Sequence, residues 1–330
     1  MIPVHVLTGF LGSGKTTLLN RALRSGFGPD TAVVVNEFGE IGLDQLFVQS
    51  HSEETVVLAS GCVCCIVRSD LSSTLLQLLA QRRDDAKPLR RVVIETSGIA
   101  EPLPILQTLR SDFNLRTRFR AGSVVCAVSA IDDTALHRRR EAIAQITAAD
   151  GIVITKHDLA PGGTAQAMQS AVATLNPLAD AVPAEGKAFV DWLMHRESVP
   201  DHAWRGRRFE HQAPNHGHSH DVRSVTIRAP APRSWAHFAV WLTRLIFLHG
   251  DRILRTKGVL FDRERNIWIG VHGVGRFFHP PVHLELASPP ADGACLVFIT
   301  ENLDPALIER SFGRIAQAAD AAPELADSAT

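Results

Sequence analysis

A glycine-rich segment near the N-terminus carries the clearest chemistry in the sequence. Residues 9–16 read GFLGSGKT and match the G-x-x-x-x-G-K-[ST] phosphate loop, after an apolar run and before a helical one. Such glycines let backbone N–H groups turn toward phosphates, and the helix that follows adds its partial positive charge. We expect Lys15 to reach the β- and γ-phosphates and the Thr16 hydroxyl to coordinate Mg²⁺. The predicted phosphate-binding residues are Gly9, Gly12, Ser13, Gly14, Lys15, Thr16 and Thr17.

A second motif, Thr155-Lys156-His157-Asp158, follows a late apolar run and predicts which base is bound. An aspartate at its end can accept two hydrogen bonds, from guanine N1–H and from the exocyclic amine. Adenine offers no such pair of donors and would leave a buried carboxylate unpaired. The stem of Lys156 can lie over the base, while Thr155 replaces a commoner asparagine, which removes one supporting hydrogen bond. The motif therefore predicts GTP rather than ATP.

The apolar run VVIETSG at residues 92–98 occupies the position of a Walker B strand. The carboxylate of Glu95 can hold the Mg²⁺ shell or orient water, and the N–H of Gly98 can sense the γ-phosphate. Residues 36–40, NEFGE, form a candidate switch segment after the second predicted strand. No residue that orients the attacking water is recognisable, so we expect slow intrinsic hydrolysis. The predicted catalytic residues are Lys15, Thr16 and Glu95.

A cluster of cysteines, GCVCC at residues 61–65, introduces metal chemistry between the switch segment and the Walker B strand. Thiolates select soft or borderline ions such as Zn²⁺, Cu⁺ or Co²⁺. In an extended chain Cys62 and Cys64 share one face and Cys65 points the other way, so a turn is needed to gather all three. Two further cysteines, each alone in an apolar strand, are expected to be core residues: Cys126 and Cys295.

Three sulfurs with one exchangeable ligand would suit a site that must release its metal. Glu37, Glu40 or a histidine are the candidates for the fourth ligand. A second group of candidate metal ligands lies in the segment HGHSH and comprises His216, His218 and His220. Neutral imidazoles in a flexible loop bind metal weakly, and a solvated polar linker is the alternative interpretation of that segment.

The composition excludes several classes of function. The net charge of −1 provides no overall field toward nucleic acid or an acidic membrane. No apolar run reaches the roughly 18 residues that span a bilayer, and the N-terminal residues do not resemble a signal peptide. Five cysteines in 330 residues, three of them clustered, do not indicate a disulfide framework. We therefore expect a cytoplasmic protein without nucleic-acid or membrane partners.

The pattern of elements predicts two domains. Apolar strands alternate with amphipathic helices over residues 1–195, which is typical of an α/β P-loop NTPase fold with a doubly wound, mostly parallel sheet. Residues 196–221 form a predicted histidine-rich linker. Residues 222–316 predict a smaller α+β domain with a mainly antiparallel sheet, and residues 317–330 a disordered tail.

The combined motifs resemble the CobW-like metal-handling GTPases. The matching segments are GFLGSGKTT at 9–17, NEFGEIGLD at 36–44, GCVCC at 61–65, ETSG at 95–98, TKHD at 155–158 and RTKGVLF at 255–261. This resemblance implies GTP hydrolysis, binding of Zn²⁺ or Co²⁺ at the cysteines, and transfer of the metal to a client metalloprotein. A nucleotide-dependent oligomer is a further state to test.

Three alternative functions remain open. A GTPase that assists cobalt insertion in cobalamin synthesis would have the same motifs. A P-loop kinase acting on a small molecule would prefer ATP, which Asp158 disfavours. A passive metal-storage protein would not need the intact Lys15, Thr16 and Glu95.

Overall fold

The computed structural model describes most of the chain: residues 1–36, 55–58, 67–82, 88–132, 139–195, 221–286 and 290–320. The chain divides into two compact units, Met1–Ser198 and Val199–Thr330.

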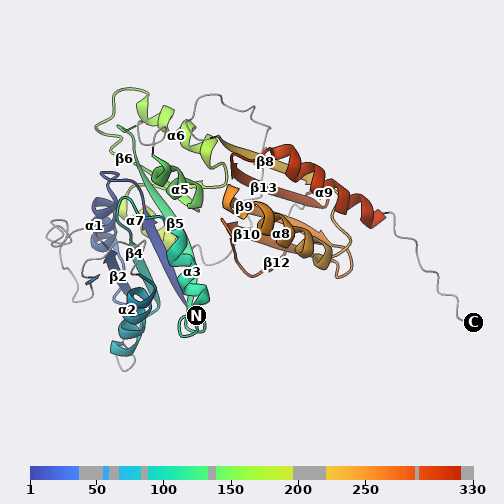
Figure 1. Cartoon of the computed structure of the whole chain (residues 1–330). Helices are drawn as coiled ribbons and strands as arrows, with labels where there is room; N and C mark the ends of the chain where they lie inside the picture. The colour runs from blue at the N-terminus through green and yellow to red at the C-terminus, as the bar shows by residue number, and fades with distance from the viewer. Residues whose placement is uncertain are drawn as a thin grey trace, which may run out of the picture. The chain divides into compact units, whose positions relative to one another are not determined.

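The first unit is built on a parallel sheet of seven strands in the order β3-β2-β4-β1-β5-β6-β7 (Figure 1). The strands are β1 (Ile2–Thr8), β2 (Thr31–Asn36), β3 (Thr55–Leu58), β4 (Arg91–Glu95), β5 (Phe119–Ser129), β6 (Gly151–Thr155) and β7 (Asp180–Ala181). The central strands are apolar in succession because helices cover both faces of the sheet, which leaves no solvent-facing row for polar residues.

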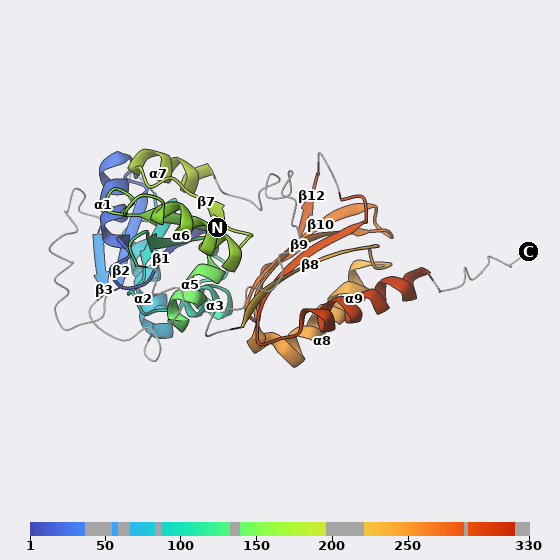
Figure 2. The same cartoon turned by 90° about the horizontal axis from the view of Figure 1, so that it is seen from above.

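The helices of this unit lie on both faces of its sheet, with α1 and α7 on one face and α2, α3 and α5 on the other (Figure 2). They are α1 (Lys15–Ser25), α2 (Val67–Gln81), α3 (Leu103–Ser111), α5 (Arg140–Ala148), α6 (Thr164–Leu175) and α7 (Gly186–His195). The core beneath α1 and α7 joins Leu18 and Leu19 to Phe189 and to Leu7 of β1. This packing fixes the start of α1 against the sheet.

The second unit contains a six-stranded sheet in the order β11-β10-β9-β13-β8, with β12 paired to β10. The long strands of this sheet pair in antiparallel fashion: β10 with β9, β9 with β13, and β13 with β8. The strands are β8 (Val222–Ala229), β9 (Ile253–Asp262), β10 (Ile267–Val274), β11 (Phe277–Phe278), β12 (Val282–Leu284) and β13 (Ala294–Glu301). Helices α8 (Trp235–His249) and α9 (Pro305–Asp320) cover one face of this sheet, and a 3-10 turn, Gly250–Arg252, follows α8 (Figure 2).

An aromatic cluster forms the core under α8 and α9. Phe238 and Phe312 are fully buried, and Trp241 meets Phe312 edge to face with ring centroids 5.1 Å apart. Phe298 of β13 meets Trp241 in the same way at 6.1 Å. The indole N–H of Trp241 donates to Ser311 Oγ at 3.1 Å, so its polar atom is satisfied inside the cluster.

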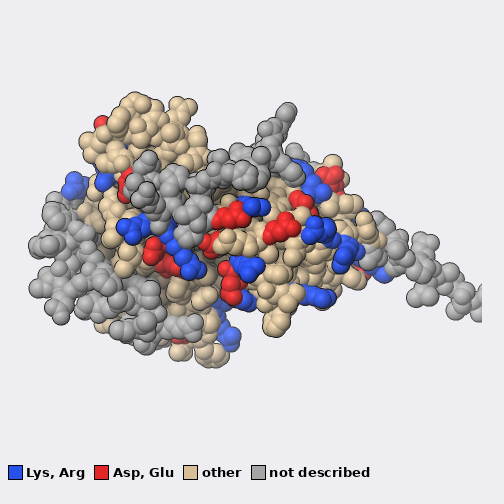
Figure 3. Space-filling view, turned by 45° about the horizontal axis from the view of Figure 1, so that its top comes forward, with Lys and Arg blue, Asp and Glu red and all other residues tan. Residues whose placement is uncertain are grey.

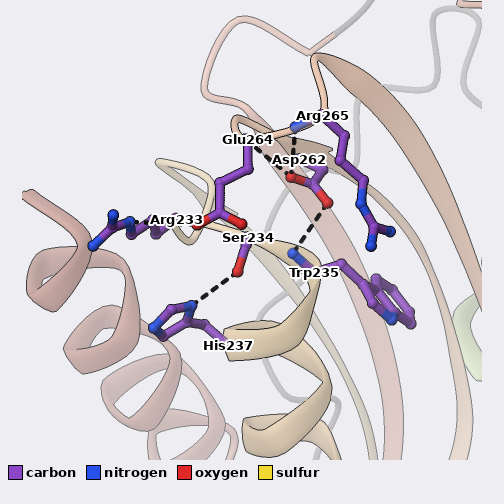
Figure 4. A network of polar contacts seen from close by, with 7 residues as sticks. All are labelled: Arg233, Ser234, Trp235, His237, Asp262, Glu264 and Arg265. Atoms are coloured by element: carbon purple, nitrogen blue, oxygen red, sulfur yellow. Dashed lines mark hydrogen bonds and ion pairs between the residues drawn. The ribbon is translucent and has the colours of Figure 1, made fainter.

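One buried carboxylate fastens the start of α8 to the β9–β10 turn (Figure 4). Asp262 is 1% exposed; its Oδ1 accepts the backbone N–H groups of Glu264 and Arg265, and its Oδ2 accepts the N–H of Trp235 at 3.3 Å. Asp262 therefore accepts a backbone N–H at the start of α8, although it lies on a strand 27 positions away in the sequence. A side chain next to the helix start usually has this capping role.

The surface is mixed in charge, with basic and acidic side chains interspersed on the face in Figure 3. Exposed ion pairs include Arg276 with Asp251 at 2.8 Å and Arg223 with Asp221 at 2.7 Å. Within the described ranges, no helix is long and apolar enough to cross a membrane.

The predicted fold class is confirmed: a parallel, doubly wound sheet is followed by a mainly antiparallel α+β unit. The sequence did not predict β11 or the 3-10 turn, since two- and three-residue elements leave no periodic pattern. Helix α9 continues to Asp320, past the boundary predicted at 316, and residues 321–330 lie outside the described part. The predicted linker also lies outside it except for Asp221. The predicted domain boundaries stay predictions.

Candidate nucleotide site

The candidate site lies at the carboxyl edge of the parallel sheet. Strands β1, β4, β5 and β6 run in one direction, so their last residues reach the same edge. The register places Leu7 beside Glu95 and Ser129 beside Thr155. Open α/β sheets bind ligands at this edge. The topology thus brings together motifs that are far apart in the sequence.

The phosphate loop turns through backbone conformations that favour glycine. Gly12 and Gly14 have φ of 71° and 87°, and Gly9 has φ of 145°. A Cβ on Gly9 would lie 2.3 Å from Ala127 O, so the loop could not pass β5 with a larger residue. Helix α1 begins directly after Gly14 and has no side-chain cap, which leaves its first N–H groups for an anion.

Lys15 lies inside the loop rather than extending into solvent. It is 8% exposed, and its Nζ donates to Gly9 O at 2.8 Å and to Phe10 O at 3.2 Å. A buried ammonium held by two carbonyls is positioned for a phosphate oxygen, which could replace either carbonyl as the stronger, charged acceptor.

Thr16 and Glu95 meet across the site. The Thr16 hydroxyl donates to Glu95 Oε1 at 2.6 Å, although the two residues are 79 positions apart in sequence. Glu95 is 4% exposed. A hydroxyl and a carboxylate side by side are the hard oxygen donors that Mg²⁺ takes beside phosphates, so this pair fits that ion.

The loop after β4 passes directly against the phosphate loop. Thr96 is joined to β1 by its N–H to Leu7 O at 2.9 Å. Gly98 is buried, and a Cβ there would lie 2.7 Å from the backbone N and Cα of Leu11. The structure thus brings Gly98 to the phosphate loop.

Gln145 of α5 also belongs to this region. It is fully buried, and its Nε2 donates to Gly98 O at 3.1 Å and Ala100 O at 2.9 Å. We did not predict it, because it lies in an unremarkable helix and in no motif. The only signal was a glutamine on an otherwise apolar helix face.

The motif predicted to read the base, residues 155–158, begins at the end of β6. The Thr155 hydroxyl lies 2.6 Å from Ser13 O and 3.2 Å from Val128 O, and it donates its single hydrogen to one of these carbonyls. It therefore links β6 to the phosphate loop. Lys156 has φ of 56°, which turns the chain sharply after the strand. Lys156 is half-buried and Asp158 is exposed, so the carboxylate is accessible to a ligand.

The predicted metal ligands all lie outside the described residues: Glu37, Glu40, Cys62, Cys64, Cys65, His216, His218 and His220. Among the residues that are described, no group of three His, Cys, Asp or Glu side chains could hold a metal ion. Cys126 and Cys295 are buried core residues, as predicted, and burial raises the pKa of the Cys126 thiol to about 12.

Comparison with known proteins places both units in families. Residues 3–183 match the CobW/HypB/UreG nucleotide-binding domain, and residues 222–316 match the cobalamin synthesis protein cobW C-terminal domain. The zinc chaperone YjiA of Escherichia coli is 32% identical over 274 residues, which cover 80% of this chain and 84% of the relative.

Two further similarities cover most of the chain. The zinc-regulated GTPase metalloprotein activator 1 of Schizosaccharomyces pombe is 26% identical over 318 residues, covering 84% of this chain and 76% of the relative. The crystal structure of Zn(II)-bound YjiA GTPase from E. coli has the same fold, with a TM-score of 0.71, 22% identity and coverage of 95% and 98% of the two chains. Because the nucleotide-binding domain matches more than half of the chain and a relative 32% identical aligns with 80% of it, this chain belongs to the CobW/HypB/UreG family of nucleotide-binding proteins.

Proposed function

We propose that this chain is a GTPase that binds Zn²⁺ and delivers it to a client metalloprotein under the control of the nucleotide. The observation that carries the proposal is the meeting of Thr16 with Glu95 at 2.6 Å beside a phosphate loop, in a chain whose relatives are named zinc chaperones.

The phosphates would bind the loop from Gly9 to Thr17. The backbone N–H groups that the loop glycines turn inward, together with those at the start of α1, would bind the phosphate oxygens. Lys15 would add a positive charge beside them. Asp158 would accept the two guanine donors, with Lys156 over the base. Thr155 would act indirectly, because its hydroxyl holds the phosphate loop at Ser13.

Mg²⁺ would be held by Thr16 and Glu95. When bound, the ion neutralises charge on the β- and γ-phosphate oxygens. Lys15 stabilises charge on the same oxygens, and the N–H of Gly98 is the candidate contact for the γ-phosphate. Hydrolysis would be slow, because no water-orienting residue is recognisable in the sequence.

The zinc cargo would bind Cys62, Cys64 and Cys65, with Glu37 or Glu40 completing the site and Co²⁺ as the alternative metal. The sheet supports this assignment, since β2 and β3 are paired and their last residues, Asn36 and Leu58, are partners. The glutamates follow Asn36 and the cysteines follow Leu58. Cys62 is four residues past Leu58, so the chain can carry it at most about 14 Å away.

This placement would couple metal to nucleotide, because β2 also pairs with β4, where Val35 lies beside Glu95. His216, His218 and His220 would supply a weaker second metal site. We further propose that the protein is cytoplasmic and that its oligomeric state depends on the nucleotide. A role in cobalt insertion is the alternative, and a cobalamin defect in a deletion strain would favour it.

The experiment that tests the nucleotide assignment compares phosphate release from GTP and ATP in Mg²⁺. We expect turnover with GTP only; an ATP preference would instead support a small-molecule kinase. Asp158→Asn should weaken guanine nucleotide binding about 10-fold or more and improve binding of xanthine nucleotides, whose C2 carbonyl accepts from the new carboxamide. His157→Asn, at an exposed neighbouring position, is the matched control and should change neither.

The experiment that tests the metal assignment measures Zn²⁺ stoichiometry on reduced protein. We expect one tightly bound ion, lost in Cys64→Ala and retained in Cys295→Ala, whose thiol is buried in the second unit. Equal zinc binding by both variants would contradict the cysteine site.

A further inference from the structure

The amide of Gln145 connects α5 to the loop that follows β4. Both of its N–H hydrogens are used, one toward Gly98 O at 3.1 Å and one toward Ala100 O at 2.9 Å. The side chain is 0% exposed, so bulk solvent does not compete for these bonds. Two bonds to carbonyls two residues apart fix the orientation of the intervening peptides. They hold the peptides that follow Gly98, and so limit where Gly98 and its N–H, which belongs to the preceding peptide, can lie.

The same loop is confined from its other side by the phosphate loop. A Cβ on Gly98 would lie 2.7 Å from Leu11 N, so there is no free space between the two backbones. A movement of Leu11 toward Gly98 on phosphate binding would therefore displace the Gly98 loop or be resisted by it. The two hydrogen bonds from Gln145 to the Gly98 loop would oppose such a displacement.

A small cavity, lined mostly by apolar atoms, lies between Gln145 and the phosphate loop. Ser13, Ser129 and Gln145 are among its lining residues, and the cavity offers about 20 Å³ to the centre of a water molecule. Three oxygens of these residues are buried and make no hydrogen bond to described residues: Ser13 Oγ, Ser129 Oγ and Gln145 Oε1. A cavity above roughly 10–15 Å³ has room for a water molecule, which needs two to four polar partners, and these three oxygens are the candidates.

We propose that Gln145 is a positioning residue that couples the phosphate loop to the Gly98 loop. Its N–H groups fix the Gly98 loop, and its Oε1 shares one buried water with Ser13 of the phosphate loop and Ser129 of β5. If the Gly98 loop is already ordered, its contact with the γ-phosphate costs no further conformational entropy, which raises the affinity for GTP. The affinity for GDP is unaffected, because GDP has no γ-phosphate. This inference rests on the proposed function, because only GTP presents a γ-phosphate to Gly98.

The primary test is Gln145→Met, which keeps the length of the side chain and removes its hydrogen bonds. We expect the affinity for a non-hydrolysable GTP analogue to fall about 10-fold relative to the affinity for GDP. The matched control is Asn176→Leu. Asn176 is 1% exposed, and its amide donates to Ile146 O at 2.7 Å and Ala149 O at 2.9 Å, at the C-terminal end of α5. We expect this control to lower the melting temperature and leave the GTP-to-GDP affinity ratio within about twofold.

Ser129→Ala tests the water separately and remains decisive if Gln145→Met does not fold. If the Ser129 hydroxyl has no partner, its removal is neutral or stabilising. If it binds the shared water, the melting temperature falls and the affinity ratio moves in the same direction as for Gln145→Met, by about 3-fold.

The outcomes separate the inference from the proposed function. If the wild-type protein binds neither GTP nor GDP, both are wrong. If it binds both nucleotides but Gln145→Met weakens them equally, or behaves like Asn176→Leu, the coupling role of Gln145 is wrong and the GTPase assignment stands. A neutral Ser129→Ala would overturn the shared water.

Discussion

The two units place their polar residues in different parts of their sheets. In the first unit, Thr16, Glu95 and Thr155 come from three distant segments and gather at one edge, because parallel strands all end there. In the second unit, neighbouring strands end at opposite edges, and the buried Asp262 is used to hold α8 to a turn. Strand direction, more than composition, decides where chemistry can assemble.

The units also differ in what stabilises them. The second unit relies on a tight aromatic cluster around Phe238, Trp241 and Phe312. The first relies on a mostly aliphatic core beneath α1 and α7, and the glycines and polar groups of its candidate site lie at the edge of the sheet. If this division is right, core substitutions and site substitutions should have separable effects.

The largest expected effect is on the aromatic core. Phe238→Ala removes a fully buried ring, so we expect the second unit to lose about 3–5 kcal/mol of unfolding free energy while GDP affinity is unchanged. Denaturant titrations followed by tryptophan fluorescence, with GDP binding in parallel, test this. A loss of GDP affinity of the same size would show that the units do not have separate stabilities.

Lys15→Ala is the corresponding substitution at the site. Because it removes a buried charge aimed at the phosphates, we expect GTP hydrolysis to fall about 10²–10³-fold, with zinc binding retained in the absence of nucleotide. Phosphate release is the measurement. Lys187→Ala, which removes an exposed lysine on α7 of the same unit, should hydrolyse GTP normally. Normal hydrolysis by Lys15→Ala itself would exclude the proposed phosphate site.

His5 predicts a pH dependence confined to the first unit. Burial, and then the nearby Arg91 and Arg120, lower its pKa from 6.5 to about 4, while Asp150 opposes this shift. The unfolded chain therefore binds a proton that the folded one does not between these values. Stability should be full above pH 6.5 and fall by at most about 3 kcal/mol as the pH drops toward 4.

His5→Gln is the matched variant for this effect. Its amide oxygen can accept the Ser123 N–H that His5 Nδ1 accepts at 3.1 Å, but it does not titrate. The difference in unfolding free energy between the two proteins should grow with falling pH in that window. Parallel pH profiles would assign the slope to other groups.

The smallest expected effect concerns Asp262. Asp262→Ala removes the acceptor for three backbone N–H groups, and we expect the second unit to lose about 1–2 kcal/mol with no change in nucleotide binding. Glu264→Ala is the control, since its carboxylate makes an exposed ion pair with Arg233 at 3.4 Å. An equal loss of unfolding free energy in both variants would show that the effect does not come from the hydrogen bonds that Asp262 accepts.

The sequence predicted those parts of the site whose signal is local. The phosphate loop, Glu95 and the motif at Thr155 each carry their own spacing, and their position after apolar strands placed them at one edge of a parallel sheet. Gln145 could not be found in this way, because its role depends on contacts with Gly98 and Ala100, 47 and 45 positions away.

The most direct test of nucleotide-controlled metal binding is a Co²⁺ titration of the reduced protein, followed by optical absorption with Zn²⁺ as competitor. It should be run without nucleotide, with GDP and with a non-hydrolysable GTP analogue. We predict intense thiolate charge-transfer bands that disappear in Cys64→Ala, and a metal affinity that differs about 5- to 150-fold between nucleotide states. Identical affinities in all three states, or no such bands in any of them, would contradict the account.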